Sequence, residues 1–291
     1  MRKVNLDFVE NKLIQIKPFL KWAGGKRALS AFIMPFVPKY FKAYFEPFLG
    51  GGALFFTLFQ KGLLKQEVIL NDKNKELINT YKILQNNLSK LLQILENFQI
   101  NHNKEHFYKI RNLDRNKDFI NENSIFRAAR FIYLNKTCFN GLCRYNAKGE
   151  FNTPLGSYKN PKIYEKELLL NASLALQNTQ IYDNDFERIC GGAKENDFIY
   201  FDPPYYPLNK TSSFVSYTDM FLEEEQERLA KLFKKLNLKG VKVLQSNSNT
   251  PFIRELYKGF EIIELKAKRM INCKGEKRGE ITELLIKGNY E

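Results

Sequence analysis

At 291 residues, 44% of them hydrophobic, the chain is long enough for one large α/β domain or for a domain with a sizeable insertion. Its 46 Lys and Arg against 32 Asp and Glu leave a formal net charge of +14, which favours a polyanionic partner such as nucleic acid or an anionic membrane. An AT-rich genome, which enriches Lys and Asn, would also raise the charge. The sequence has neither an apolar run of the roughly 18 residues that span a bilayer nor the apolar core of a signal peptide, so we expect a cytoplasmic protein with no membrane segment.

The first segment with a chemical signature is residues 19–27, in which Lys21, Lys26 and Arg27 surround a pair of glycines. It superficially resembles a phosphate-binding loop but lacks that loop's leading glycine and its hydroxyl residue, so ATP binding is not expected. The cations indicate a charged rim. Trp22, taken alone, is equally compatible with a packed core.

A predicted strand, Ala43 to Glu46, runs into the glycines at 50–52, where the backbone could approach a ligand closely. The dinucleotide fingerprint G-x-G-x-x-G is incomplete because Phe55 replaces the third glycine. The next predicted strand, Glu67 to Asp72, ends in a carboxylate twenty residues after Gly52. This spacing suits an acid that binds both hydroxyls of an adenosine ribose.

About a hundred residues then interrupt the alternation of strands and helices, too many for a simple crossover. We expect an inserted domain at residues 81–164, with the rest of the molecule, residues 1–80 and 165–291, forming the sheet domain. The first part of the insert has helical periodicity. Its second part, Thr137 to Tyr164, is rich in Gly, Asn, Pro, aromatic residues and cations, which is the composition of an ordered binding loop.

Metal and disulfide chemistry are not expected. His102 and His106 match the H-x-x-E-H pattern of a zinc peptidase family, but their segment is polar and offers no obvious third ligand. The cysteines have neither the paired spacing of a zinc site nor the density of a disulfide scaffold, so we expect reduced thiols. They are Cys138, Cys143, Cys190 and Cys273.

Five more short β-branched or aromatic runs follow and alternate with helical stretches, which predicts a mostly parallel, doubly wound sheet of seven strands in all. These runs are Thr179 to Asp183, Asp197 to Asp202, Val241 to Ser246, Phe260 to Leu265 and Thr282 to Lys287.

The strongest local signal is an apolar strand, residues 198–201, that ends in Asp202, Pro203, Pro204 and Tyr205. Ligands in such sheets bind at the carboxyl ends of the strands. Methylation of an aromatic amine is difficult because the nitrogen lone pair is delocalised, so a catalyst must accept hydrogen bonds from both N–H groups. Asp202 and the Pro203 carbonyl offer these acceptors, and Tyr205 offers a face for a planar base. The structural alternative is a strand that simply ends in an Asp cap and a Pro-Pro turn.

Taken together, these motifs resemble the α-type amino-methyltransferases of DNA, more closely the Dam-like adenine methyltransferases that recognise GATC, over nearly the whole chain. In that family a KWAGGK segment precedes the glycine-rich loop, a recognition domain follows, and DPPY comes afterwards, as it does here. The resemblance implies an α/β fold in which a Rossmann-like seven-stranded methyltransferase sheet carries an inserted, mainly helical target-recognition domain. It further implies S-adenosylmethionine as methyl donor, no metal, double-stranded DNA as partner, and flipping of the target adenine.

The resemblance also implies roles for individual residues. In the S-adenosylmethionine site, Asp185 and Phe186 would hold the adenine of the cofactor. The full set that would line this site is Trp22, Lys26, Phe48, Gly50, Gly52, Asp72, Asp185, Phe186, Asp202 and Tyr205.

Residues 140–161 resemble the family's target-reading hairpin. Phe139 stands where an aromatic wedge enters the duplex; relative to a tyrosine wedge it keeps stacking and loses a hydroxyl hydrogen bond. Arg144 would read one guanine and Lys21 the other, and the planar fork of arginine suits guanine on chemical grounds, with a phosphate clamp as the alternative. The remaining DNA contacts implied for the hairpin are Asn140, Leu142 and Pro154. We also expect Arg127, Arg130 and Lys136, on the preceding helix, to contact the DNA backbone.

Two rival classes of function remain at this point. One is methyl transfer to another planar amine, such as cytosine, an RNA base or a protein glutamine; Asp202 and the insert favour adenine in DNA, since the glutamine enzymes look like they place Asn before PPY. The other is a DNA-binding protein without turnover, which the intact glycine loop and Tyr205 count against. Both a methylase paired with a cognate restriction endonuclease and a solitary one are compatible with the sequence.

Overall fold

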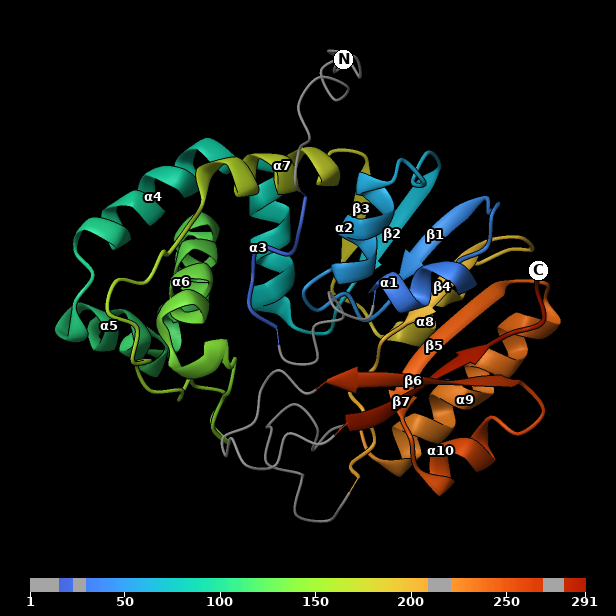
Figure 1. Cartoon of the computed structure of the whole chain (residues 1–291). Helices are drawn as coiled ribbons and strands as arrows, with labels where there is room; N and C mark the ends of the chain where they lie inside the picture. Colours follow the sequence, from blue (N-terminus) through green and yellow to red (C-terminus); the bar gives the residue numbers. More distant parts are fainter. Residues whose placement is uncertain (1–15, 23–29, 209–220, 269–279) are drawn as a thin grey trace.

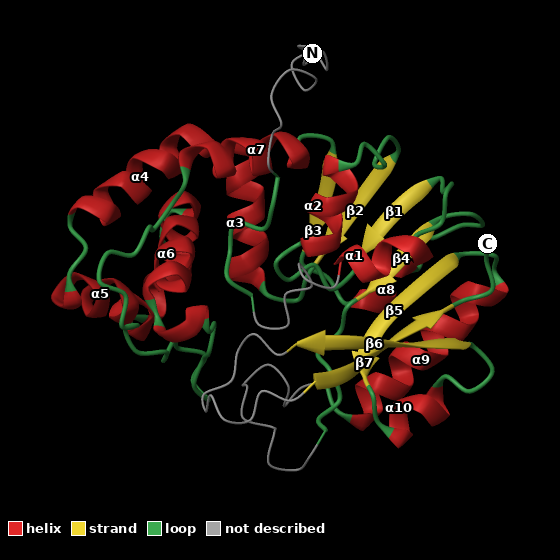
Figure 2. Cartoon of the chain, viewed as in Figure 1, coloured by secondary structure: helices red, strands yellow, loops and turns green. Residues whose placement is uncertain are grey.

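A computed structural model of the chain describes residues 16–22, 30–208, 221–268 and 280–291. The described residues form a seven-stranded sheet with helices on both faces and a group of helices beside it (Figures 1 and 2). The strands are β1 (Ala43–Glu46), β2 (Glu67–Asn71), β3 (Thr179–Tyr182), β4 (Phe198–Phe201), β5 (Lys242–Ser248), β6 (Glu261–Lys268) and β7 (Glu280–Lys287).

The strand order is β3-β2-β1-β4-β5-β7-β6. The first five strands in this order are parallel to one another, and β7 runs antiparallel to both of its neighbours, β5 and β6. The predicted seven-stranded, mostly parallel sheet is therefore confirmed. The central strands β1 and β4 are buried at every position, as expected of parallel strands covered on both faces. The sequence predicted both strands because their runs are aromatic or apolar, apart from Glu46 at the end of β1.

Alternate side chains of the strands enter two hydrophobic clusters, one on each face of the sheet. Tyr44 and Tyr200 belong to one cluster, and Phe45 and Phe201 to the other. Helices α1 (Ser30–Ile33), α2 (Ala53–Gln60), α3 (Lys75–Asn86) and α7 (Lys166–Leu176) supply the first cluster. Helices α8 (Phe186–Cys190), α9 (Glu223–Leu238) and α10 (Pro251–Leu256) supply the second.

The group of helices beside the sheet consists of α4 (Leu88–Ile100), α5 (Lys104–Arg111) and α6 (Ser124–Thr137), which pack near α3 (Figure 1). Their buried residues belong to the same hydrophobic cluster as the face of the sheet that α3 covers. Short 3-10 turns complete the described helices: η2 (Met34–Phe36), η3 (Asn112–Arg115), η4 (Lys117–Asn121) and η5 (Phe139–Gly141). In the part of the chain that the structure describes, no helix is both long and apolar enough to cross a bilayer.

Helix α5 was not predicted, and it contains the second of the two histidines. The side chain of Asn103 caps it by accepting a hydrogen bond from the His106 backbone N–H at 2.8 Å. Phe107 is fully buried, and the ring of His102 is hydrogen-bonded to the Tyr133 hydroxyl at 2.8 Å. The histidines thus lie in an aromatic packing arrangement between α5 and α6.

Candidate active site and nucleic-acid interface

Asp202 to Tyr205 follow β4 directly, at the carboxyl end of a central strand. The strands next to it in the sheet are β1 and β5, so the loops that follow β1 and β4 meet at one edge of the sheet. In Figure 1 the arrowheads of β1 and β2 point toward the middle of the molecule, where α3 lies. The predicted catalytic segment and the predicted glycine loop therefore lie on the same side of the fold.

Two buried amides hold the backbone on either side of Tyr205. Gln226, in the first turn of α9, donates from Nε2 to the carbonyl of Pro204 at 2.9 Å. Asn247, on β5, accepts from the Tyr206 N–H at 3.3 Å and donates to the Gln226 Oε1 at 2.9 Å. Both amides are fully buried, so this chain of hydrogen bonds fixes the shape of the turn after β4.

The hydroxyl of Tyr205 donates to the carboxylate of Glu283, on β7, at 2.7 Å. Desolvation raises the pKa of Tyr205 well above its ordinary value, and the nearby Asp202 and Glu283 carboxylates add to the shift. The phenol is therefore a neutral hydrogen-bond donor, and its bond to Glu283 sets the orientation of the ring.

The loop after β1 takes a conformation that favours glycine, with φ of +47° at Gly50 and +67° at Gly52. A Cβ added to Gly50 would lie 2.6 Å from Nε1 of Trp22, so the indole rests directly on the loop. The N–H of Gly50 donates to Oδ2 of Asp72 at 2.9 Å, which joins the ends of β1 and β2. The structure thus brings these four predicted residues together.

Asp72 accepts two backbone hydrogen bonds, from Gly50 and from Asn74, the latter at 2.9 Å. Burial raises the pKa of its carboxyl, and these two hydrogen bonds oppose the rise. Because each carboxylate oxygen can accept more than one hydrogen bond, Asp72 keeps acceptor capacity for ligand hydroxyls.

Glu46 is a buried carboxyl that the sequence analysis did not identify as part of the site. It accepts from the Tyr44 hydroxyl at 2.7 Å and from the Phe55 N–H, in the first turn of α2, at 3.1 Å. Burial raises the pKa of Glu46 to about 8, and the negative charge of Asp202 contributes to the rise. At neutral pH the protonated form prevails, so two adjacent negative charges do not accumulate at the end of β1.

A group of aromatic rings lies near Phe48, the residue that follows β1 and Pro47. The ring of Phe48 lies 5.3 Å from that of Phe186 and 5.4 Å from that of Phe221. Asp185 caps α8 by accepting from the Glu187 N–H, and it forms an ion pair with Arg228.

The guanidinium of Arg228 also lies over the Phe186 ring, 4.3 Å from its centroid. The predicted pair Asp185 and Phe186 is therefore held in place by one residue of α9.

Asn71 links the strand ends that carry these groups. Its side chain donates to the carbonyls of Pro47 and Asn184, both at 3.0 Å, and accepts from the Asn184 N–H at 2.8 Å. The amide therefore ties the loop after β1 to the loop after β3.

The predicted reading hairpin is present as an irregular antiparallel pair of segments, with bridges between Cys138 and Leu155 and between Tyr145 and Phe151. Phe139 exposes 40% of its surface, and Arg144 and Pro154 are exposed as well.

Leu142 and Asn140 are half-buried, and Asn140 takes a left-handed conformation with φ of +54°. The hairpin thus presents an aromatic ring, a cation and a proline ring to solvent.

Arg144 is oriented within the hairpin by Asn152. Its Nε donates to the Asn152 Oδ1 at 2.7 Å, and Nη2 lies 3.5 Å from the Asn152 carbonyl. Lys21 lies beside the hairpin, with its ammonium 3.9 Å from the centroid of the Tyr158 ring. Lys26 lies outside the described residues.

One of the three cations expected to contact the DNA backbone, Arg130, does not fit that expectation. Arg130 is buried; it donates to the carbonyls of Ile110 and Arg111 and pairs with Asp114 at 2.8 Å. Arg127 forms an ion pair with Glu76. The prediction was wrong for Arg130 because a cation within a helix sequence gives no sign of an internal partner, and for Arg127 it stays a prediction. Lys136 is half-buried near Lys21, and burial lowers the pKa of Lys136 to about 8.

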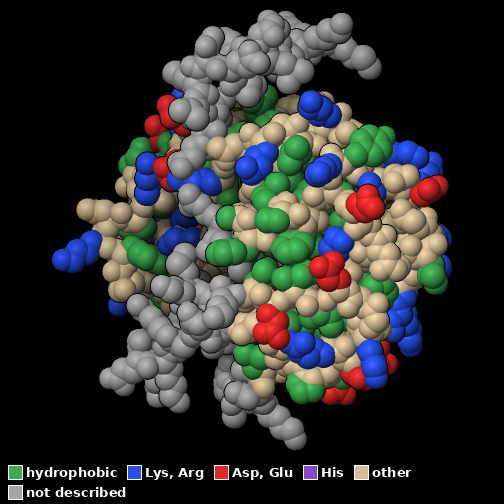
Figure 3. All heavy atoms as spheres, turned by 45° about the vertical axis from the view of Figure 1, so that its right-hand side comes forward, with side chains coloured by type: hydrophobic (Ala, Val, Ile, Leu, Met, Phe, Trp, Pro, Cys, Tyr) green, Lys and Arg blue, Asp and Glu red, His purple; other side chains and the backbone are tan. Residues whose placement is uncertain are grey.

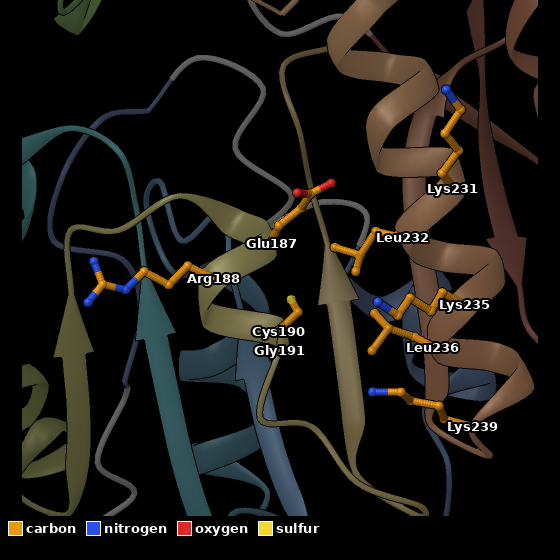
Figure 4. A pocket seen from close by; sticks show the side chains of 9 residues that line it. All are labelled: Glu187, Arg188, Cys190, Gly191, Lys231, Leu232, Lys235, Leu236 and Lys239. Atoms are coloured by element: carbon orange, nitrogen blue, oxygen red, sulfur yellow. The ribbon is translucent and has the colours of Figure 1, made fainter.

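A hollow of about 460 Å³ lies between α8 and α9, and none of the predicted site residues lines it (Figure 4). Its lining is Glu187, Arg188, Cys190, Gly191, Lys231, Leu232, Lys235, Leu236 and Lys239. On the face shown in Figure 3, the Lys and Arg side chains of the described residues are scattered among acidic and apolar ones. The net positive charge is therefore not gathered into one patch on that face.

The order of strands, with its reversed β7, and the glycine loop beside the motif after β4 define a Rossmann-like methyltransferase. Residues 22–271 match the D12 class N6 adenine-specific DNA methyltransferase family, and the chain belongs to this family. It is 47% identical to the type II methyltransferase M.MjaIII of Methanocaldococcus jannaschii, over 94% of this chain and 99% of that protein.

It is also 43% identical to the type II methyltransferase M1.LlaDCHI of Lactococcus lactis subsp. cremoris, over 97% of this chain and 98% of that one. Identity to the DNA adenine methylase of Escherichia coli is 36%, over 92% of this chain and 94% of that one. The protein is thus an adenine-specific DNA methyltransferase, and this activity implies S-adenosylmethionine as the methyl donor.

Proposed function

We propose that the enzyme methylates the N6 amino group of adenine within GATC in duplex DNA, after the target adenine has turned out of the helix. Residues 1–80 and 165–291 would bind the cofactor and carry out catalysis, and residues 81–164 would recognise the target. The observation that carries the proposal is the joint placement of the DPPY turn and the glycine loop at one sheet edge, with a hairpin that exposes Phe139 and Arg144.

The residues at this edge fit S-adenosylmethionine, which when bound supplies an electrophilic methyl group. The left-handed glycines let the backbone approach the ligand closely, and Asp72 retains acceptor capacity for two ribose hydroxyls. Phe48 and Phe186 offer apolar faces for a planar base, and the Asp185 carboxylate can accept from its amino group. We assign to this site Trp22, Lys26, Phe48, Gly50, Gly52, Asp72, Asp185, Phe186, Asp202 and Tyr205.

For the target base, the Asp202 carboxylate and the Pro203 carbonyl each accept a hydrogen bond from one of the two N–H groups of the adenine amino group. These hydrogen bonds polarise the N–H bonds toward nitrogen and favour a pyramidal nitrogen whose lone pair is free to attack. When the nitrogen becomes cationic, its hydrogen bond to Asp202 strengthens, and a proton can leave through that bond. Tyr205, held by Glu283, supports the face of the base.

The exposed hairpin supports a mode of target recognition. Phe139 is an apolar ring on a solvent-facing turn and can stack in the space that the extruded adenine leaves. Arg144 and Lys21 can each donate to the major-groove acceptors of a guanine, and the site GATC contains one guanine on each strand. Leu142 and Pro154 offer apolar contact to a thymine methyl group, with Asn140 beside them.

The experiment is to incubate the purified protein with S-adenosylmethionine and unmethylated genomic DNA, and then to map methylated bases by sequencing. We expect N6-methyladenine in GATC on both strands. Adenine methylation in a different sequence would overturn the GATC assignment alone. Methylated cytosine would overturn the assignment of the catalytic site, because Asp202 and its neighbours are argued to position an adenine.

A further inference from the structure

Asn135, in the last turn of α6, is a fully buried amide whose partners come from two separate parts of the predicted DNA interface. Its Oδ1 accepts from the N–H of Lys21 at 2.8 Å, and its Nδ2 donates to the carbonyl of Lys21 at 2.6 Å. The same Nδ2 donates to the carbonyl of Gly141, in the hairpin, at 3.1 Å. One amide thus satisfies both backbone groups of Lys21 and one of the hairpin.

The packing around Lys21 reinforces this junction. Gly141 has a φ of +67°, and a Cβ added there would lie 2.5 Å from Cβ and 2.8 Å from Cδ of Lys21. The ammonium of Lys21 lies 3.4 Å from the carbonyl of Lys136 and over the ring of Tyr158. Lys21 is therefore fixed at its backbone by Asn135 and along its side chain by the hairpin and its surroundings.

The hairpin between Gly141 and Arg144 is itself stiffened by cross-connections. The carbonyl of Leu142 accepts from the Thr153 hydroxyl at 2.7 Å, and the Asn152 N–H donates to the carbonyl of Arg144 at 2.9 Å.

Because of these bonds, we expect a shift of Gly141 to be passed on to Arg144. Lys21 and Arg144 are thus connected through one junction at Asn135, a residue that lies 114 positions after Lys21 in the chain.

We propose that Asn135 is a specificity-determining positioning residue that fixes the spacing between Lys21 and the hairpin, so that the two guanines of the site are read as one unit. This inference rests on the proposed function, in which Lys21 and Arg144 contact those guanines. Loss of the amide leaves buried backbone groups without partners, and the junction must rearrange to satisfy them. The contacts of Lys21 and of Arg144 with the two guanines are then both displaced.

The test compares methylation rates on GATC with rates on duplexes in which either outer base pair is replaced. Lys21→Ala and Arg144→Ala should each lower discrimination at one outer pair, by roughly 5- to 150-fold. Asn135→Ala should lower it by about tenfold at both pairs, although Asn135 itself contacts no base. A ratio of rates is insensitive to the fraction of folded enzyme, so instability alone would not produce this pattern.

Two further variants keep the test decisive. Gly141→Ala disturbs the same junction from the hairpin side, because its Cβ would meet Lys21, and should show the same double loss even if Asn135→Ala does not fold. Asn79→Ala is the matched control: its amide joins α3 to the start of α6 by donating to the Ser124 carbonyl at 2.8 Å, and discrimination should stay unchanged.

Loss at one pair or at neither in the Asn135 and Gly141 variants, while Lys21→Ala and Arg144→Ala behave as stated, would overturn the coupling and leave the proposed function standing. Unchanged discrimination in Lys21→Ala and Arg144→Ala would instead overturn the proposed base reading, and the present inference with it.

Discussion

Replacing Arg144 by alanine tests how the enzyme reads its site. The guanidinium donates from Nε and from Nη2 to Asn152, which leaves Nη1 and the second N–H of Nη2 for an end-on contact with O6 and N7 of a guanine. A bidentate contact of this kind contributes about 1–3 kcal/mol to discrimination, which corresponds to roughly 5- to 150-fold in rate at one base pair. Arg144→Ala should relax discrimination by that factor at one outer pair and spare the others.

The assay measures methylation of GATC and of each single-base variant at two salt concentrations. Lys148→Ala is the control, because Lys148 is an exposed cation at the tip of the same hairpin and is assigned no base contact. It should leave the order of preferred sequences unchanged. If Arg144→Ala instead weakened all duplexes alike and lowered the salt slope by about one unit, the residue would be a phosphate clamp and the reasoning would be refuted.

Three further predictions concern other parts of the site. Because burial raises the pKa of Glu46 from its ordinary 4.5 to about 8, the folded protein keeps a proton there that the unfolded chain releases, so this group lowers stability as pH rises through that range. Glu46→Gln should remove this loss, which is measured as the change in Tm between pH 5 and pH 9 for the wild type and the variant. The same change in Tm in both proteins would contradict the assignment. Gln226→Met keeps the size of the side chain but cannot donate to the Pro204 carbonyl, so kcat should fall roughly 10- to 100-fold with little change in KM, whereas an unchanged kcat would show that the turn holds its own shape. A duplex whose target adenine is mispaired should bind more tightly than the paired duplex because unpairing costs less, and equal affinities in a titration would count against extrusion of the base.

The positions of the seven strands were predictable because the strands carry strong local signals, whereas their order and the antiparallel β7 were not predicted. The run at Phe198–Phe201 is apolar throughout, that at Ala43–Glu46 is apolar up to its last residue, and prolines follow both closely. Helix α5 was not predictable in the same way, because its sequence is polar and short. Its formation depends on the Asn103 cap and on burial of Phe107 and Ile110 against distant helices.

In the candidate site, too, contiguous motifs were predictable from the sequence and isolated residues were not. Asp202 to Tyr205 and the glycines at 50–52 form contiguous motifs, so their chemistry can be read from neighbouring residues. Gln226, Asn247 and Asn135 are single amides, and each acquires a role only from a partner far away in the chain.

The same limitation explains the error at Arg130. Its ion pair with Asp114 and its bonds to two helix carbonyls are tertiary contacts that local sequence does not encode.

The central claim is that the carboxylate after β4 assists methyl transfer to the adenine amino group. The most direct measurement uses methyl-labelled S-adenosylmethionine, duplex DNA and mass spectrometry of the nucleosides, for the wild-type enzyme and for Asp202→Asn, which keeps the size of the side chain. We predict labelled N6-methyldeoxyadenosine with the wild type, and a rate lower by at least about 100-fold with Asp202→Asn while cofactor and DNA affinities change little. Labelled methylcytosine, or a variant with the wild-type rate, would contradict the account.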